Sequence, residues 1–199
     1  MAFARRKLQR RRGERRYRKI FIIATEGAET EPLYFRMFNY QEAAIHVRCL
    51  RDRHGSSPAK VLKRMIQHIN NLELKKTDEA WLVVDKDQWS DLQLSELHSW
   101  SLGNENYGLA VSNPKFEYWL LLHFEDGNNI SSSQDCSAHL RRYLPNYEKS
   151  HVEKDKLEPK ILDAISRARQ KDTPPCSDWP RSNGTTVYKL VEKLLNTAD

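Results

Sequence analysis

Apolar and polar positions alternate along the chain in short blocks that predict strands followed by helices. Runs rich in β-branched and aromatic residues predict strands at residues 19–25, 45–50, 80–84 and 107–111. Apolar residues at spacings of three and four, with capping residues before them, predict helices at 30–44, 58–72, 90–102 and 116–124. More helices are expected at 135–144 and 155–170, and from Thr185 onward. Strands that alternate with helices indicate an α/β fold with a mainly parallel sheet flanked by helices, followed by additional C-terminal helices.

The length of 199 residues suits one domain with a core of its own. We expect a flexible basic arm at residues 1–18 and a single folded domain at 19–199. Within that domain, residues 19–125 would form the α/β core and residues 126–199 a helical extension. An apolar segment of about 20 residues, which a bilayer span requires, does not occur in the sequence. A membrane-spanning protein is therefore not expected, and neither is a secretory signal.

Positive charge is concentrated at the beginning of the chain. The formal net charge is +6, but residues 5–19 hold ten bases and one acid, so this stretch carries +9 and the rest carries −3. A cationic arm of this kind attracts RNA, DNA or an anionic membrane face by counterion release. The alternative is a leader that only keeps the protein in solution.

Cysteine usage points to a reducing compartment. Cys49, Cys136 and Cys176 are far apart and odd in number, which predicts neither a disulfide framework nor a zinc site. A cytoplasmic location fits this pattern. The sequence also has no phosphate-binding loop of the Gly-x-x-x-x-Gly-Lys-Ser/Thr type, so nucleotide energy would have to come from a partner protein.

Acidic residues follow three of the predicted strands. Glu26 follows the first strand, Asp85 and Asp87 follow the third, and Glu117 lies just beyond the fourth. The carboxyl ends of parallel strands share one edge of a sheet, and on an extended Asp-x-Asp both side chains point to the same side. Carboxylates brought together this way repel each other, and a hard divalent cation such as Mg²⁺ or Mn²⁺ relieves the repulsion. The alternative is that these acids are ordinary loop and capping residues.

Several segments together resemble a known family. A glutamate and glycine after the first strand, with Asp-x-Asp after a later one, resemble the Toprim domain of topoisomerases, primases and OLD-type nucleases. Residues 25–32, 56–58, 85–87, 113–124 and 183–187 are more closely similar to the RloB family, small Toprim-like proteins found near restriction-modification and other antiphage genes. The segment Asn113-Pro114-Lys115-Phe116-Glu117-Tyr118-Trp119 is the most specific part.

The resemblance implies metal-dependent cleavage of phosphodiester bonds. It makes Glu26 a metal ligand or general acid/base, and Asp85 and Asp87 metal ligands. OLD-type nucleases have a further acid four positions after the first glutamate; here Glu29 and Glu31 stand at three and five, and we favour Glu31. Glu117 would complete the site.

Several basic residues are candidates for contacts with phosphate. Lys115 and Lys86 could add positive charge at a scissile phosphate. The candidates for binding the nucleic-acid backbone are Arg10, Arg11, Arg12, Arg15 and Arg16 of the arm, with His54, Lys86, Arg181 and Lys189. Each could equally be a solvated surface residue.

These observations lead to one preferred function and two alternatives. The preferred function is a nuclease that uses one or two Mg²⁺ or Mn²⁺ ions to cleave RNA, including tRNA, or DNA, as an effector of antiphage defence. A partner protein of the defence system would supply an ATPase or a sensor, and self-association is left open. The first alternative is a non-catalytic nucleic-acid-binding or partner-docking module on a Toprim scaffold. The second is another phosphotransfer activity, such as nucleotidyl transfer.

Overall fold

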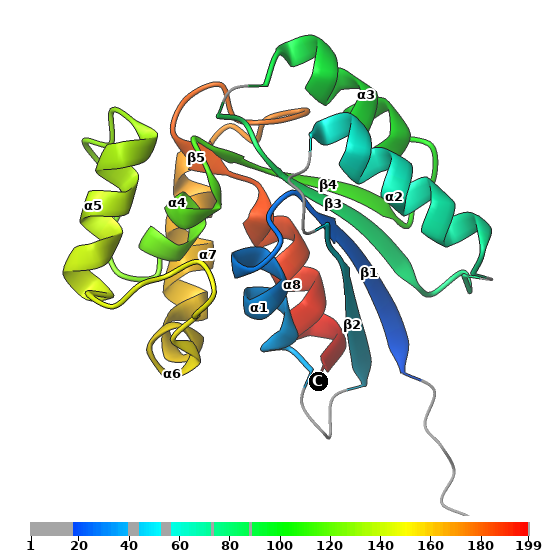
Figure 1. Ribbon diagram of the computed structural model, residues 1–199, viewed down its shortest axis with the longest axis horizontal. Coiled ribbons are helices and arrows are strands. Elements are labelled where there is room, and N and C mark those ends of the chain that lie inside the picture. The colour runs from blue at the N-terminus through cyan, green and yellow to red at the C-terminus, as the bar shows by residue number, and fades with distance from the viewer. Residues whose placement is uncertain (1–17, 40–43, 53–56, 73, 88, 199) are drawn as a thin grey trace, which may run out of the picture.

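The computed structural model describes residues 18–39, 44–52, 57–72, 74–87 and 89–198, which form one sheet with helices on both faces (Figure 1). The strands lie in the order β2-β1-β3-β4-β5. Their bounds are β1 Lys19–Thr25, β2 Ile45–Leu50, β3 Glu79–Asp85, β4 Tyr107–Asn113 and β5 Gly184–Thr185. The first four are parallel to their neighbours, and β5 is antiparallel to β4. The predicted α/β fold with a mainly parallel sheet is confirmed, and it is consistent with a Toprim-like arrangement.

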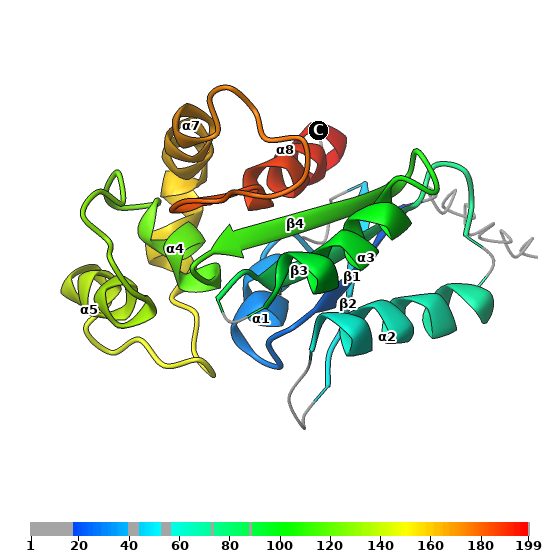
Figure 2. The same cartoon turned by 90° about the horizontal axis from the view of Figure 1, so that it is seen from above.

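The helices divide between the two faces of the sheet (Figure 2). α2 and α3 cover one face, and α1, α4 and α8 cover the other; α5 lies beyond α4, and α7 packs against both α4 and α8. The bounds are α1 Thr30–Arg36, α2 Pro58–Asn70, α3 Asp91–Ser101, α4 Phe116–Leu121, α5 Ser133–Tyr143, α6 Lys154–Leu157, the 3₁₀ helix η1 Glu158–Lys160, α7 Ile161–Lys171 and α8 Val187–Ala198. None of the described helices has both the length and the apolar character that crossing a bilayer demands.

Each central strand serves two hydrophobic cores. In β1, Phe21 and Ile23 point into the core beneath α1 and α8, whereas Ile22 and Ala24 point into the core beneath α2 and α3. All four side chains are fully buried. A strand covered on both faces needs apolar residues at every position, which explains the unbroken run in the sequence.

The strand order places a crossover point at the ends of β1 and β3. From β1 the chain moves outward to β2 and then returns across β1 to β3, so successive connections leave in opposite directions. In open α/β sheets, the crevice outside the carboxyl ends of such a strand pair is the usual place for a ligand. Glu26 and Asp85 stand at the ends of these two strands.

Two elements differ from the sequence prediction. The helix expected to run to residue 44 ends at Arg36, because the Asn39 side chain turns away to pair with β2. Its amide donates to the carbonyl of Val47 at 2.9 Å and accepts from the Val47 N–H at 2.7 Å. In addition, the segment expected to begin the last helix at Thr185 first forms β5, so the C-terminal part of the chain completes the sheet as well as adding helices.

Candidate active site

Four carboxylates line one cleft at the carboxyl edge of the sheet. The cleft has a volume of about 480 Å³ and lies outside the ends of β1 and β3. Its acids are Glu26, Glu31, Asp85 and Glu117, joined by Glu29 at its border. The remaining lining residues are Gly27, Ala28, Thr30, Phe116 and Lys149. Lys149 is the one cation among these lining residues, so the cleft is strongly acidic.

Glu26 is fixed by two hydrogen bonds. Its Oε1 accepts from the indole N–H of Trp89 at 2.8 Å, and its Oε2 accepts from the backbone N–H of Asp85 at 3.1 Å. The glutamate after β1 is thereby tied to the end of β3 and to the loop that follows.

The other three carboxylates are each held by one neighbour. The Gly27 N–H donates to Oε1 of Glu31 at 2.8 Å, and the Phe116 N–H donates to Oδ1 of Asp85 at 2.8 Å. The Tyr147 hydroxyl donates to Oε1 of Glu117 at 3.2 Å. These contacts bring together α1, β3, α4 and the segment after α5.

Gly27 is required by the close approach of Glu31. A Cβ atom at Gly27 would overlap the Glu31 carboxylate. The glycine therefore lets the loop after β1 wrap around a charged group in the first turn of α1.

Burial and mutual repulsion make the cleft costly to ionise. Burial, followed by repulsion from Glu31, Glu26 and Glu117, raises the pKa of Asp85 well above its ordinary value. Burial raises the pKa of Glu31 to about 7, with Glu117 and Glu26 adding repulsion. Burial also raises the pKa of Glu26, although its bonds to Trp89 and the Asp85 N–H oppose the rise. Raised pKa values on neighbouring carboxyl groups indicate a site that would gain from a bound cation.

Asp87 and Lys115 lie outside the residues that line the cleft. β3 ends at Asp85, so the Asp-x-Asp is not extended and Asp87 stands in an exposed turn, where it accepts from the Ser133 hydroxyl at 3.3 Å. The Asp87 charge still raises the pKa of Glu26, which places it near the cleft. Lys115 donates to the Ser137 hydroxyl at 2.7 Å.

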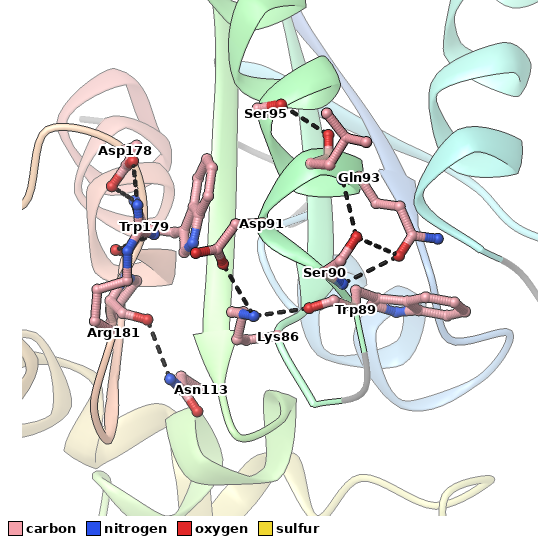
Figure 3. A network of polar contacts seen from close by, with 12 residues as sticks. Lys86, Trp89, Ser90, Asp91, Gln93, Ser95, Asn113, Asp178, Trp179 and Arg181 are labelled. Carbon is pink, nitrogen blue, oxygen red and sulfur yellow. Dashed lines mark hydrogen bonds and ion pairs between the residues drawn. The ribbon is translucent and has the colours of Figure 1, made fainter.

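Three of the basic residues predicted to contact nucleic acid lie in ion pairs, two of which are drawn in Figure 3. Lys86 is 3.1 Å from Asp91 and also donates to the carbonyl of Trp89. Arg181 pairs with Asp178 at 2.7 Å and stacks over the Trp179 ring. Lys189 pairs with Asp172 at 3.2 Å. His54 and the arm arginines Arg10, Arg11, Arg12, Arg15 and Arg16 lie outside the described residues.

Three residues of the site carry no clear signal in the sequence. Trp89 was detectable only as a large aromatic residue in a polar loop two positions after Asp87. Tyr147 and Lys149 reach the cleft from a segment with no recognisable pattern, where the carbonyl of Lys149 accepts from the Thr30 hydroxyl at 3.0 Å. The positions of Trp89, Tyr147 and Lys149 next to the site result from tertiary contacts and not from a local sequence pattern.

The side chains do not form a preassembled metal cage. Within the part of the chain that the structure describes, no three histidine, cysteine, aspartate or glutamate side chains converge closely enough to hold a metal ion. Each of the four cleft carboxylates instead accepts a hydrogen bond from a protein group.

Comparison with known proteins identifies the family. The model for the family described as RloB-like protein matches residues 21–194. The chain belongs to the RloB-like family. The match includes all four cleft carboxylates, and it ends within α8. Searches among curated proteins and among solved structures found no match.

Proposed function

We propose that this RloB-like protein is a metal-dependent nuclease that hydrolyses phosphodiester bonds of RNA or DNA. The observation that carries the proposal is the set of four carboxylates, Glu26, Glu31, Asp85 and Glu117, around one cleft at the crossover point of the sheet. The raised pKa values of Glu26, Glu31 and Asp85 and the single lining cation, Lys149, favour a divalent metal as the missing charge.

The donor chemistry of the cleft fits Mg²⁺ or Mn²⁺. All four side chains offer oxygen, and neither histidine nor cysteine is among the lining residues. Oxygen donors are what these hard cations prefer. Because the carboxylates now accept hydrogen bonds within the protein, binding would require some of these bonds to be exchanged for metal bonds. Glu26, Glu31 and Asp85 would hold the ion or ions, with Asp87 near enough to contribute.

The residues of the chain then have separate tasks. A bound divalent ion would lower the pKa of water and stabilise charge on a phosphate. The Trp89 indole and the Asp85 N–H orient the Glu26 carboxylate, which is available to accept a proton from water. Tyr147 orients Glu117, and Lys149 brings positive charge to a cleft that must admit an anionic phosphate.

A cleavage assay tests the proposal. Total cellular RNA and plasmid DNA are incubated with the protein and Mg²⁺ or Mn²⁺, with EDTA as the metal-free reference. We expect cleavage by the wild type and a loss of more than about 100-fold in Glu26→Gln and Asp85→Asn, because even outer partners of metal ligands cost about 10–100-fold. Asp155→Asn, an exposed change on α6, is the matched control. No cleavage of either polymer with either metal would refute the nuclease.

A non-catalytic binding module is the second candidate, and it is favoured by the lack of a preassembled metal cage. It predicts salt-dependent binding of nucleic acid that survives the combined Asp85→Ala and Asp87→Ala changes but falls when residues 5–19 are deleted. Labelled nucleotide incorporation would instead indicate nucleotidyl transfer.

The biological setting we propose is antiphage defence in the cytoplasm, with a partner protein that supplies an ATPase or a sensor. Its support is the resemblance described in the sequence analysis to small proteins found near antiphage genes, together with the match to the RloB-like family. Comparing phage plating on cells that carry the gene cluster with wild-type or Glu26→Gln protein tests this role. Equal plating would exclude it for the phages used.

A further inference from the structure

A second groove lies beside β2 and has the opposite charge to the acidic cleft. Its volume is about 500 Å³, and it is formed by the carboxyl end of β2 and one side of α2. The lining residues are Arg48, Cys49, Leu50, Arg51, Arg64, Gln67, His68 and Asn71. Three arginines, a histidine and two amides line it, and none of the lining residues is acidic.

The groove offers donors at a free edge of the sheet. β2 is the outermost strand of the sheet, so its outer side is covered by none of the other described strands (Figure 1). Arg48 and Arg51 are exposed, and the ring Nε2 of His68 is buried with no hydrogen-bond partner among the described residues. With its proton on Nε2, this ring and the exposed guanidinium groups form a set of donors that an anionic oxygen acceptor would satisfy.

Two arginines link this groove to the acidic cleft. Arg64 donates to the carbonyl of Thr25 at 3.0 Å, next to Glu26, and to the carbonyl of Leu50 at 3.0 Å. Arg51 lies 3.4 Å from the carbonyl of Ala28, a lining residue of the cleft. The groove and the cleft therefore meet at the loop that follows β1.

We propose that this groove, through Arg48, Arg51 and Arg64, binds the phosphodiester backbone of the nucleic-acid chain whose neighbouring phosphate enters the acidic cleft. This inference rests on the proposed function and extends it by naming where the substrate backbone binds outside the cleft. Guanidinium groups bind phosphate oxygens through paired N–H donors and do not depend on base sequence. A polyanion explains why positive charge gathers here, one loop away from a cleft that itself repels anions.

Binding measured without metal tests the groove independently of catalysis. Full-length protein in EDTA is titrated onto a fluorescent single-stranded RNA, and onto a DNA of the same sequence, at several salt concentrations. We expect the double variant Arg48→Gln, Arg51→Gln to bind at least tenfold more weakly. We also expect its log–log salt slope to be smaller by about 1.4, at about 0.7 per lost phosphate contact on a single strand. The matched control is Lys60→Gln, Lys63→Gln, which removes the same charge from exposed positions of α2 outside the groove.

The outcomes separate this inference from the nuclease. Equally weakened binding in the two double variants would contradict the proposed binding site, since only the net charge of the protein would then matter. A nucleoside monophosphate that competes as well as the oligonucleotide would also overturn it, because a polymer would not be the ligand. Weaker binding in the arginine variant alone supports the groove as a binding site, even if no cleavage is ever observed. Cleavage together with unchanged binding in that variant would support the nuclease function and contradict the groove as a binding site.

Discussion

At the scale of single residues, the charge on the cleft carboxyl groups affects the free energy of unfolding. Asp85 is held among three other carboxylates, and its backbone N–H supports one of them, Glu26. The fully ionised form of such an arrangement is unfavourable, and either proton uptake or the bound cation that we propose would relieve the repulsion. Stability measured with and without metal should therefore reveal the site before any activity is known.

Asp85→Asn should abolish the response of stability to metal. Asparagine retains an oxygen that accepts from the Phe116 N–H, and it removes a charge that its neighbours repel. Without metal, we expect the variant to be at least as stable as the wild type. With Mn²⁺ at 100 times its Kd, the wild type should gain about 2.7 kcal/mol and the variant clearly less. Thermal unfolding measures both, and an equal gain in the two proteins would contradict the proposed metal site.

His123 should make the fold sensitive to acid. This histidine is a hydrogen-bonded core residue: it is fully buried, its Nδ1 lies 3.0 Å from the Trp119 carbonyl and its Nε2 lies 3.2 Å from the Tyr34 hydroxyl. Burial lowers its pKa from 6.5 to about 4. Because the unfolded chain binds the proton more readily, the contribution of the neutral ring to stability is complete above pH 6.5 and falls as pH drops from 6.5 to about 4.

Denaturant unfolding of His123→Gln measures this effect. We expect the variant to be less stable at pH 7.5 and to lose less stability than the wild type between pH 6.5 and 4. His151→Gln, an exposed change, is the control and should keep the wild-type slope. Parallel pH profiles for wild type and His123→Gln would show that another group causes the acid sensitivity.

At the scale of elements, the contact between β3 and β4 depends on a missing side chain. Gly108 pairs with Trp81, and a Cβ atom at Gly108 would lie 2.5 Å from the Trp81 ring. The Trp81 indole N–H also donates to Glu79 at 2.8 Å, so the ring is not free to move aside.

Gly108→Ala should therefore destabilise the sheet by about 1–3 kcal/mol, the usual cost of overpacking a core. Gly103→Ala, at an exposed position after α3 where the nearest contact of a new Cβ is 3.1 Å, should change stability much less. Urea denaturation compares the two. A smaller effect at Gly108 than at Gly103 would contradict the packing argument.

The sequence predicts the parts of the site that follow directly from strand patterns. Glu26 and Asp85 could be placed because each follows an apolar strand and the carboxyl ends of parallel strands share an edge. The bond from Trp89 to Glu26 and the arrival of Tyr147 at Glu117 join residues 63 and 30 positions apart, so no local pattern reveals them. Asn39 ended the first helix through a contact with β2, and β5 is too short at two residues to leave a periodic signal.

At the scale of the whole molecule, the N-terminal arm and the groove at β2 are two separate clusters of positive charge. Residues 1–17 hold eight bases and one acid, while the groove is part of the folded sheet. If both contact phosphates, their contributions to the salt dependence of binding should add.

Deleting residues 1–17 should lower the salt slope by about 0.7 for each phosphate contact that the arm makes to a single strand. The shortened chain keeps Lys19 and its ion pair with Glu79. We expect it to bind weakly but to remain sensitive to the Arg48→Gln, Arg51→Gln change, as titration at several salt concentrations would measure. Loss of all binding in the shortened chain would assign binding to the arm, and residual binding that is insensitive to the arginine change would contradict the groove.

The pairing of β5 with β4 has a consequence for synthesis on the ribosome. Residues 19–113 supply the four parallel strands, but the partner of the outer end of β4 is Gly184–Thr185, translated much later. Until then, Ser112 lacks the neighbour whose hydroxyl lies 2.8 Å from its own, and that end of β4 exposes backbone groups that could pair with another nascent chain. A message truncated before codon 184 would thus yield an aggregation-prone chain, because the late-translated β5 is what pairs with this part of the β4 edge.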